Sequence, residues 1–330
     1  MKVHITNLYG QSDRSVAQIA QNMTAEIARQ LGYRELGIYN YPVAADSASE
    51  LQTRIDGIIS SLGYGDVVIF QVPTWNDMAF DEKFINTIRA YLGVKIVIYV
   101  HDVLPLMFAS NRYLMSRVIA MYNLADVIIL PSENMLDVLR EEGLTVEKTI
   151  IQGMWDHPTT VPIEAAAFKK EILFPGNPER FEFIRNWQSS VPLRVFTGSQ
   201  TQIDGNVINE GWYYEDALVN EMSKGGFGLI WYNEDVDYNK LYCPYKLGAY
   251  MAAGIPVFIQ RGMSNQELIE NNNLGFIVDS LDDVTKKIEE MTAEDYQIMV
   301  KDVRHFANLI RNGFFTRKLL TDAVYQALIK

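Results

Sequence analysis

Short apolar runs alternate with longer amphipathic segments along most of the chain, and this alternation restricts the fold more than any other feature. Residues 66–70 and 94–100 are short and almost entirely apolar, as buried strands are. Residues 15–31 instead repeat apolar side chains at helical spacing. Nearly continuous apolar strands between helices are typical of a parallel sheet covered on both faces. Up to residue 152 we therefore expect one doubly wound α/β domain, with strands at 2–6, 35–38, 66–70, 94–100, 126–130 and 148–152 and helices at 15–31, 51–62, 81–92, 111–123 and 133–142.

The alternation stops at residues 155–167, which contain two prolines and paired threonines and are typical of a linker. It then restarts, so the sequence predicts a second domain of the same Rossmann-like kind. The carboxyl ends of the strands in both domains should face a cleft. The elements expected here are strands at 171–174, 193–196, 227–232, 256–259 and 274–278, helices at 214–223, 246–253 and 265–271, and further helices from 282 onward.

Charge and cysteine content exclude several classes of function. The 330 residues carry 29 Lys and Arg against 41 Asp and Glu, a net charge of −12. An acidic protein binds phosphate backbones and anionic membranes poorly, so we expect neither nucleic acid nor a membrane surface as partner. The single cysteine, Cys243, excludes an intrachain disulfide and a cysteine-built zinc site. The first residues run directly into a strand pattern and no apolar run is long enough to span a bilayer, so we expect a cytoplasmic protein without a membrane span.

The start of the helix at 246–253 is a candidate anion site. Pro244 suits a first helical turn, where the N–H groups of Tyr245, Lys246 and Leu247 lack acceptors within the helix. These groups, the positive end of the helix dipole and the Lys246 charge together suit a diphosphate. The alternative is a solvated lysine on a helix that happens to begin with proline.

Two segments of the second half carry a family resemblance. Residues 246–257 (KLGAYMAAGIPV) and 267–278 (ELIENNNLGFIV) resemble the donor-binding region of GT-B glycosyltransferases, in which the carboxy-terminal domain binds the nucleotide sugar. Four further segments narrow the resemblance to the nucleotide-sugar-synthetase-like glucosyltransferases of Gram-positive bacteria, the second glycosyltransferases of serine-rich-repeat adhesin O-glycosylation. These segments are 7–10 (NLYG), 71–76 (QVPTWN), 101–105 (HDVLP) and 174–177 (FPGN).

The resemblance implies a fold, a reaction and a set of partners. It implies a GT-B fold with an acceptor-binding domain at 1–157, a nucleotide-sugar-binding domain at 158–313 and a last helix, 314–330, that packs back on the first domain. It implies a hexosyltransferase that moves glucose from UDP-glucose to GlcNAc O-linked to Ser or Thr of a serine-rich-repeat adhesin. UDP-glucose is then the donor substrate, no further cofactor is expected, and the protein would form a homotetramer or another homo-oligomer. The apolar face of the last helix would alternatively serve a subunit interface.

The donor-binding residues follow from the same resemblance. The loop at 174–180 enters the cleft in this family, where Arg180 would pair with a phosphate through two parallel hydrogen bonds, unless it is only a surface arginine on a turn. The loop at 7–15 lies over the donor phosphates. It lacks the GxGxxG pattern, which disfavours a nicotinamide dehydrogenase, and Ser12 or Asp13 would alternatively cap the helix that follows. The predicted donor residues are Ser15, Val16, Asn177, Arg180, Pro244, Tyr245, Lys246, Leu247, Gly248 and Ala249.

One position departs from the GT-B pattern. Many retaining GT-B enzymes have a glutamate in this helix that holds the donor ribose, and Ala249 occupies that position here. Glu267 is the alternative ribose ligand. However, 264–267 (SNQE) has the pattern of a capping box, so we favour a structural role for Glu267.

Acceptor and catalytic residues are predicted in the first domain. Asn7, Tyr9, Trp75 and Asn76 are the predicted acceptor residues, since an aromatic ring and an amide suit GlcNAc, although a core tryptophan would explain Trp75 equally well. His101 and Asp102 follow a strand that ends at the cleft, and either would serve as the base of an inverting transfer. The alternative for His101 is a hydrogen bond within its loop.

No metal site is predicted. The triplet Asp235-Val236-Asp237 is a weak metal pattern, and a helix N-terminus with Lys246 and Arg180 would offset the charge of the leaving group instead. Two alternatives to the predicted reaction remain: a GT-B enzyme with another donor or acceptor, and a non-catalytic glycoprotein-binding subunit of an adhesin-glycosylation complex.

Overall fold

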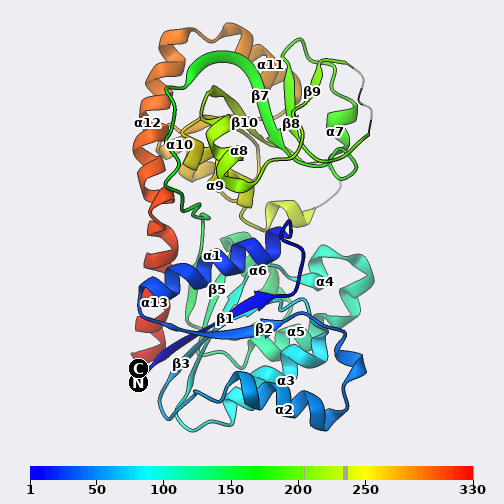
Figure 1. Ribbon diagram of the computed structural model, residues 1–330, viewed down its shortest axis with the longest axis vertical. Coiled ribbons are helices and arrows are strands. Elements are labelled where there is room, and N and C mark those ends of the chain that lie inside the picture. Colours follow the sequence, from blue (N-terminus) through cyan, green and yellow to red (C-terminus); the bar gives the residue numbers. More distant parts are fainter. Residues whose placement is uncertain (202, 204, 233–236, 330) are drawn as a thin grey trace. The chain divides into compact units, whose positions relative to one another are not determined.

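The structure is a computed structural model that describes residues 1–201, 203, 205–232 and 237–329. It divides into two compact units (Figure 1). Unit 1 is Met1–Gly153 together with Thr316–Lys330, and unit 2 is Met154–Phe315. Within the described residues each unit contains one six-stranded sheet in which all neighbouring strands run parallel. The predicted fold class, two Rossmann-like doubly wound domains, is confirmed.

The sheet of unit 1 has the strand order β2-β1-β3-β4-β5-β6. Its central strands are buried along their whole length because helices cover both faces, which explains their unbroken apolar sequence. The strands are β1 (Val3–Tyr9), β2 (Arg34–Tyr39), β3 (Val67–Val72), β4 (Lys95–Val100), β5 (Val127–Leu130) and β6 (Thr149–Ile151).

The longer helices of unit 1 begin at polar residues that cap them. Ser15, Asp77 and Ser132 each accept a hydrogen bond from a backbone N–H of the first turn. The helices are α1 (Val16–Gln30), η1 (Val43–Ala45), α2 (Ala48–Ile58), α3 (Met78–Arg89), α4 (Leu104–Met107), η2 (Ala109–Leu114), α5 (Met115–Tyr122), α6 (Glu133–Glu141) and, at the end of the chain, α13 (Phe314–Leu328).

From Thr316 onward the last helix belongs to unit 1. The Lys148 ammonium donates to the carbonyls of Gln326, at 2.8 Å, and Ile329, at 2.6 Å, and Arg317 donates to Gln30. These bonds join the end of the chain to the residue before β6 and to α1. The unit boundaries lie at 153/154 and 315/316, whereas the sequence placed the domain boundaries at 157/158 and 313/314.

The sheet of unit 2 has the strand order β12-β11-β10-β7-β8-β9. Its strands are β7 (Ala167–Pro175), β8 (Leu193–Phe196), β9 (Val207–Asn209), β10 (Gly225–Ile230), β11 (Val257–Gln260) and β12 (Gly275–Val278). Its helices are α7 (Glu182–Arg185), α8 (Glu215–Met222), η3 (Asp237–Lys240), α9 (Tyr245–Ala253), α10 (Gln266–Asn271), α11 (Leu281–Glu290) and α12 (Ala293–Arg311).

Helix α9 is fixed closely against the sheet of unit 2. The Tyr250 ring packs directly on Gly228: a Cβ added to this glycine would lie only 2.5 Å from a ring atom. The Tyr250 hydroxyl donates to the Leu173 carbonyl at 3.0 Å. A Cβ on Gly248 would lie 2.8 Å from the Trp155 carbonyl, so the helix also packs tightly against the segment before β7. Gly254, with φ +73°, ends the helix in the left-handed conformation. These close approaches determine where the first turn of α9 lies.

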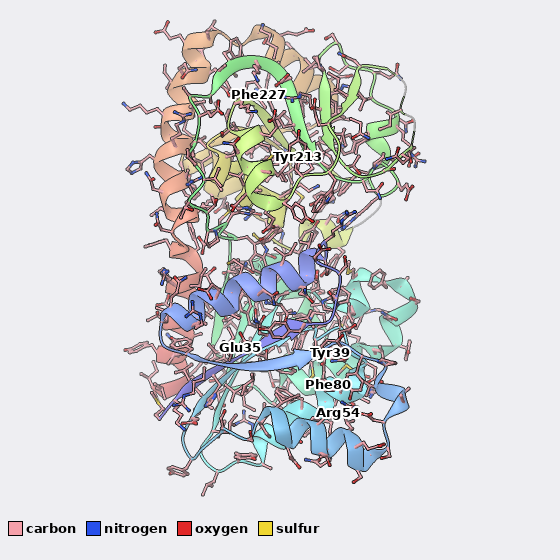
Figure 2. The ribbon with its side chains drawn as sticks, viewed as in Figure 1. Glu35, Tyr39, Arg54, Phe80, Tyr213 and Phe227 are labelled. Atoms are coloured by element: carbon pink, nitrogen blue, oxygen red, sulfur yellow. The ribbon has the colours of Figure 1, made fainter. Side chains whose placement is uncertain are left out.

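Aromatic residues occupy the interior of both units (Figure 2). In unit 1, the Phe80 ring is stacked on that of Phe84, with centres 6.0 Å apart. In unit 2, Phe227 lies 5.3 Å from Phe258 and 5.1 Å from Tyr296. Each unit therefore has its own hydrophobic core.

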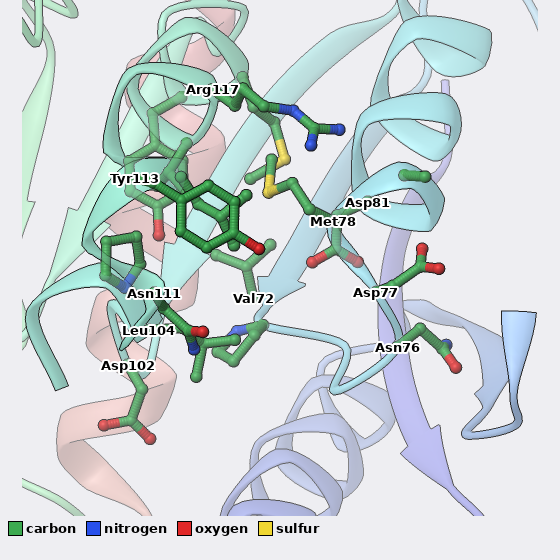
Figure 3. A pocket seen from close by; sticks show the side chains of 17 residues that line it. Val72, Asn76, Asp77, Met78, Asp81, Asp102, Leu104, Asn111, Tyr113 and Arg117 are labelled. Atoms are coloured by element: carbon green, nitrogen blue, oxygen red, sulfur yellow. The ribbon is translucent and has the colours of Figure 1, made fainter. Parts of the chain in front are cut away.

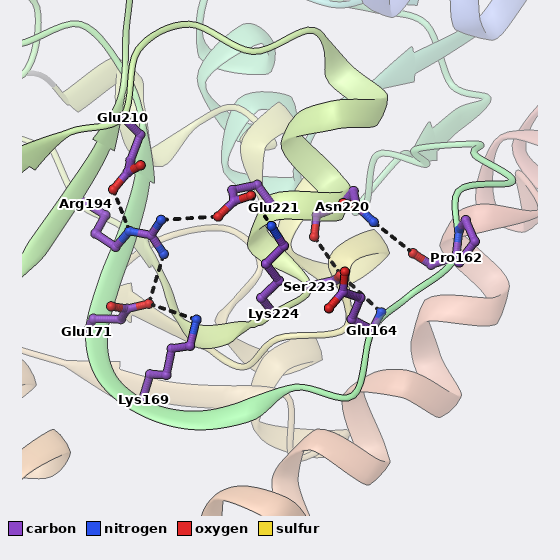
Figure 4. Close-up of polar contacts among 10 residues, drawn as sticks. All are labelled: Pro162, Glu164, Lys169, Glu171, Arg194, Glu210, Asn220, Glu221, Ser223 and Lys224. Atoms are coloured by element: carbon purple, nitrogen blue, oxygen red, sulfur yellow. Dashed lines mark hydrogen bonds and ion pairs between the residues drawn. The ribbon is translucent and has the colours of Figure 1, made fainter.

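A charged cluster joins three elements of unit 2 (Figure 4). The Arg194 guanidinium on β8 contacts Glu171 of β7 at 3.1 Å, Glu210 at 2.8 Å and Glu221 of α8 at 3.2 Å. Only 13% of the Arg194 side chain is exposed. A partly buried guanidinium needs such partners, so the cluster ties the outer strands to α8.

Candidate active site

The first turn of α9 has the predicted Pro244 at its N-cap. The Leu247 N–H donates to the Pro244 carbonyl at 3.0 Å, so this predicted donor is already used inside the turn. Across the described residues, the N–H groups of Tyr245 and Lys246 have no acceptor. Two of the three predicted N–H groups are thus available to an anion.

The Lys246 ammonium is held by aromatic rings. Its Nζ lies 3.9 Å from the centre of the Phe181 ring, 4.0 Å from that of Phe174 and 5.7 Å from that of Tyr232. The nitrogen is buried although part of the stem is accessible, and no acceptor for it occurs in the described part of the chain. Burial, with a smaller effect of the Arg180 charge, holds the Lys246 pKa well below its usual value. The alternative of a solvated lysine is therefore wrong.

Arg180 lies close to the same rings. It is exposed, and its guanidinium carbon is 5.4 Å from the centre of the Phe181 ring. Among the described residues no carboxylate pairs with it. Among the described residues, Lys246 and Arg180 therefore place two basic side chains without carboxylate partners around Phe181.

Asn177 shapes the turn that carries Arg180. Its side-chain oxygen accepts from the Glu179 N–H at 2.9 Å, and its carbonyl accepts from the Arg180 and Phe181 N–H groups, each at 3.0 Å. The predicted donor residue Asn177 thus has a structural role in orienting Arg180 and Phe181.

Gly248 and Ala249 lie on buried sides of α9, and Ala249 is 4% exposed. The predicted capping box at 264–267 does not form. Asn265 is the N-cap of α10 without a side-chain cap bond, and the Ser264 hydroxyl donates to the Tyr242 carbonyl at 3.0 Å. Glu267 is exposed and is not held by that box, so the predicted structural role is wrong.

The predicted donor residues of unit 1 are at the start of α1. Ser15 is the cap, accepting from the Gln18 N–H at 3.4 Å, so neither Ser12 nor Asp13 caps this helix. The Ser15 N–H donates to the Ser12 carbonyl at 2.9 Å, which leaves it unavailable to a phosphate in this conformation. Val16 is 54% exposed.

Two predicted acceptor residues, Asn7 and Tyr9, share one carboxylate. The Asn7 amide donates to Glu35 at 2.9 Å and the Tyr9 hydroxyl donates to the same carboxylate at 2.5 Å. The Asn7 oxygen also accepts from Asn22 at 2.6 Å. Asn7 is therefore a buried structural residue, and Glu35 is a partner that the sequence did not indicate.

A cavity of about 390 Å³ opens in unit 1 beyond the ends of β3 and β4 (Figure 3). It is lined by the predicted residues Asn76 and Asp102 but not, within the described chain, by Trp75 or His101. Trp75 has φ +59°, and its carbonyl accepts from Asn40 at 2.5 Å. The remaining polar lining residues were not predicted from the sequence; they are Asp77, Asp81, Asn111, Tyr113, Arg117 and Tyr122.

Asp81 is the carboxyl group of this lining whose pKa is most strongly shifted. It is 5% exposed, and the Thr74 hydroxyl donates to it. Burial raises its pKa to about 7, so it is partly protonated at neutral pH. The sequence placed Asp81 only at a helix start, because nothing in the local pattern distinguishes a buried carboxyl from a solvated one.

His101 and Asp102 are in different environments. The buried His101 ring makes a 2.9 Å hydrogen bond from Nε2 to Gln71, and burial lowers its pKa to about 3. It is neutral at physiological pH and a weak base. Asp102 instead lines the cavity, so it is the better candidate for contact with a ligand there.

Within the described residues, no group of three or more His, Cys, Asp or Glu side chains is placed to hold a metal ion. Of the triplet 235–237, Asp235 and Val236 lie outside the described residues. Among the helices described, none is long and apolar enough to cross a bilayer.

Almost the whole chain is similar to proteins of one glucosyltransferase family. Residues 2–154 match the family described as "Glucosyltransferase 3-like, N-terminal domain" and residues 172–323 the corresponding C-terminal domain. The chain is 52% identical over 329 residues to Glucosyltransferase 3 of Streptococcus parasanguinis, covering 99% of both chains. It is 47% identical over 334 residues to Glucosyltransferase 3 of Streptococcus gordonii, covering 99% of this chain and 100% of that one.

Solved structures share the fold. Anabaena Alr3699/HepE in complex with UDP and glucose has a TM-score of 0.66 at 11% identity, covering 98% of this chain and 99% of that one. Sucrose-phosphate synthase from Thermosynechococcus elongatus has a TM-score of 0.65 at 12% identity, covering 98% of both. The chain belongs to the glucosyltransferase 3-like family, and it is a hexosyltransferase with the GT-B fold.

Proposed function

We propose that this enzyme transfers glucose from UDP-glucose to GlcNAc that is O-linked to Ser or Thr of a serine-rich-repeat adhesin. The observation that carries the proposal is the buried Lys246 ammonium at the start of α9, beside Arg180 and without an acceptor in the described chain. A buried ammonium without an acceptor is stabilised when an anion arrives, and a diphosphate could contact this ammonium together with the exposed Arg180 guanidinium.

The donor half of the proposal rests on unit 2. The β-phosphate would accept hydrogen bonds from Lys246 and from the free N–H groups of Tyr245 and Lys246, while the exposed Arg180 would reach the other phosphate. As the bond to glucose breaks, the same groups would stabilise the negative charge that grows on UDP, which is why we propose a reaction that needs no metal ion. Solved structures of Alr3699/HepE with UDP-glucose support this donor class.

The acceptor half rests on unit 1. The cavity offers Asn76 and Asn111 amides and the Asp102 carboxylate for sugar hydroxyls, with Met78, Leu104 and Val118 beside them. This mixture of amide, carboxylate and apolar lining suits a single sugar ring with its N-acetyl group. We propose that GlcNAc occupies this cavity and that Asp102 accepts a hydrogen bond from the hydroxyl that receives glucose.

The proposed domain roles follow. Residues 1–157 form the acceptor-binding part, 158–313 the nucleotide-sugar-binding part, and 314–330 the returning helix. The proposal includes a cytoplasmic location, where UDP-sugars are available, and a homotetramer or another homo-oligomer, in keeping with the resemblance of the sequence segments given above.

A transfer assay tests the proposal. The protein is incubated with a GlcNAc-bearing serine-rich peptide and, separately, UDP-glucose, UDP-galactose or UDP-GlcNAc, with and without EDTA, and the products are weighed by mass spectrometry. We expect addition of one hexose from UDP-glucose alone, equally with EDTA. Preference for another UDP-sugar, strict dependence on added manganese, or transfer to unmodified peptide would each contradict the corresponding part of the proposal.

A further inference from the structure

The ammonium of Lys246 lies in the corner between two rings. Phe174 ends β7 and Phe181 follows the turn after it, and their ring planes meet at 82° with centres 4.9 Å apart. Lys246 Nζ lies over both, 4.0 and 3.9 Å from their centres. The Tyr232 ring is a third aromatic ring near the Lys246 ammonium. The Tyr232 hydroxyl accepts a hydrogen bond from the Tyr242 hydroxyl at 2.6 Å.

The backbone is shaped to bring these rings together. A Cβ on Gly176 would lie 2.3 Å from an atom of the Phe174 ring and 3.0 Å from one of Phe181, so only glycine fits at that point of the turn. The Asn177 carbonyl then accepts from the Phe181 N–H and turns the chain back toward β7. The corner is thus formed by the local sequence from 174 to 181.

Aromatic faces and carboxylates hold an ammonium differently. A carboxylate would pair with the lysine and occupy its N–H donors, whereas a ring face attracts the cation through its quadrupole and accepts no conventional hydrogen bond. In the described part of the chain the Lys246 ammonium has only ring partners. Its donors are therefore available to an incoming ligand, and its position is set before the ligand arrives.

We propose that Phe174 and Phe181 are positioning residues for donor binding, which hold the Lys246 ammonium at the start of α9 with its N–H groups free for the oxygens of a nucleoside diphosphate. This inference rests on the proposed function, because it assigns the ligand of the same site. The two phenylalanines act through Lys246 and do not themselves contact the phosphates.

The arrangement has a consequence for pH dependence. Among the described residues, the titratable groups that face Lys246 are Arg180, whose charge opposes its protonation, and Tyr232, whose own pKa is raised well above its usual value by burial. Because a diphosphate is anionic, it binds the protonated form of Lys246 better than the neutral form. The affinity for the diphosphate should therefore fall as pH rises through the lowered pKa of Lys246. Attraction to the ring faces offsets part of the free-energy cost of burying the Lys246 ammonium. Removing one ring should therefore lower the pKa of Lys246 further, and the loss of affinity should occur at lower pH.

The experiment compares Phe181→Leu with Phe183→Leu. Phe183 is a matched control, because it is buried like Phe181 and packs edge-on against Phe174 at 4.9 Å, but no cation lies over it in the described chain. UDP affinity is measured by calorimetry across a pH series, in which the ionisation of UDP affects all proteins equally. We expect Phe181→Leu to weaken binding about tenfold, as the loss of a desolvated cation–π contact predicts, with its pH profile moved to lower pH. Phe183→Leu should change affinity less than about threefold and leave the profile in place.

A second variant separates ring chemistry from packing. Phe181→Tyr keeps a ring face, so it should retain UDP affinity and the parental profile. Two outcomes would overturn the inference: equal UDP affinities in Phe181→Leu and Phe183→Leu, or a pH profile of Phe181→Leu that moves to higher pH because water enters. In either case, UDP binding by the parent protein would leave the proposed function standing. Absence of UDP binding by the parent protein would instead overturn the proposed function, and the inference with it.

Discussion

The ring of Tyr250 lies so close to Gly228 that a Cβ on the glycine would come within 2.5 Å of it. Through this approach the Tyr250 hydroxyl reaches the carbonyls of Leu173, at 3.0 Å, and Leu229, at 3.2 Å. One tyrosine of α9 is thus bonded to two strands, and the cationic first turn of that helix is held at the same end of the sheet as Phe174.

Gly228→Ala should therefore destabilise unit 2. The added methyl group must displace the Tyr250 ring, and overpacking of this kind costs roughly 1–3 kcal/mol. The free energy of unfolding is measured by urea titration, with hydrogen exchange to localise the change to unit 2. Gly57→Ala in α2 is the control, because no atom lies within 4 Å of its Cβ and alanine favours a helix. Equal effects of the two substitutions would contradict this account of α9.

The buried Asp81 makes the stability of unit 1 depend on pH. Its pKa is raised from 3.8 to about 7, so the folded state retains a proton that the unfolded state has lost between these values. The contribution of Asp81 to the free energy of unfolding should be greatest below pH 4. It should fall by up to about 4 kcal/mol as the pH rises to 7.

Asp81→Asn keeps an oxygen that accepts from Thr74 and cannot ionise. We expect this variant to lose most of the decline in stability between about pH 4 and 7, and to be more stable than the parent protein at the upper end of that range. The measurement is hydrogen exchange of the β3 segment in both proteins across this pH range, which reports the stability of unit 1. The same pH dependence in both proteins would show that Asp81 ionises freely in the folded state.

Arg194→Met should destabilise unit 2 strongly, because it leaves Glu171, Glu210 and Glu221 close together without their shared cation. The loss of one member of a partly buried charge cluster costs roughly 3 kcal/mol. Arg261→Met is the matched control, since Arg261 pairs at 2.6 Å with Asp279 but both side chains are more than half exposed. That exposed pair should contribute little to stability, because water and salt screen it. Thermal unfolding compares the two, and similar melting temperatures would contradict the role given to the cluster.

Asp102→Asn should separate catalysis from donor binding. If Asp102 assists the acceptor hydroxyl, its loss should lower kcat by about 100-fold or more while the affinity for UDP stays unchanged. Asp56→Asn, on exposed α2, serves as the control. Parental transfer rates in Asp102→Asn would exclude Asp102 from the reaction, and a parallel loss of UDP affinity would argue against its place in an acceptor cavity.

Much of the fold was predictable from the sequence. The buried strands β3, β4 and β5 are continuous apolar runs, and the family resemblance to GT-B glucosyltransferases is confirmed by the comparisons. The first residues of β7 and the edge strand β9 were missed because β9 is only three residues long and the start of β7 (AFKK) is not an apolar run. The predicted helix at 111–123 begins as the 3₁₀ segment η2 and becomes α-helical only at Met115.

The site was only partly predictable. Pro244 and Lys246 follow from local pattern, since capping and dipole effects act within one turn. The aromatic surroundings of Lys246 do not, because Phe174, Phe181 and Tyr232 meet only through the turn at Gly176 and the packing of β10 on β7. The same holds for Asp81, whose burial depends on the helices that enclose the unit 1 cavity.

The central claim is that Lys246 binds the diphosphate of a UDP-sugar, and calorimetric titration of UDP into Lys246→Ala tests it most directly. The matched control is Lys287→Ala, whose ammonium also lies over a ring, 5.0 Å from the centre of Phe276, but on α11. We predict at least a tenfold loss of UDP affinity in Lys246→Ala, with an unchanged fold by circular dichroism, and parental affinity in Lys287→Ala. Parental UDP affinity in a folded Lys246→Ala protein would contradict the account.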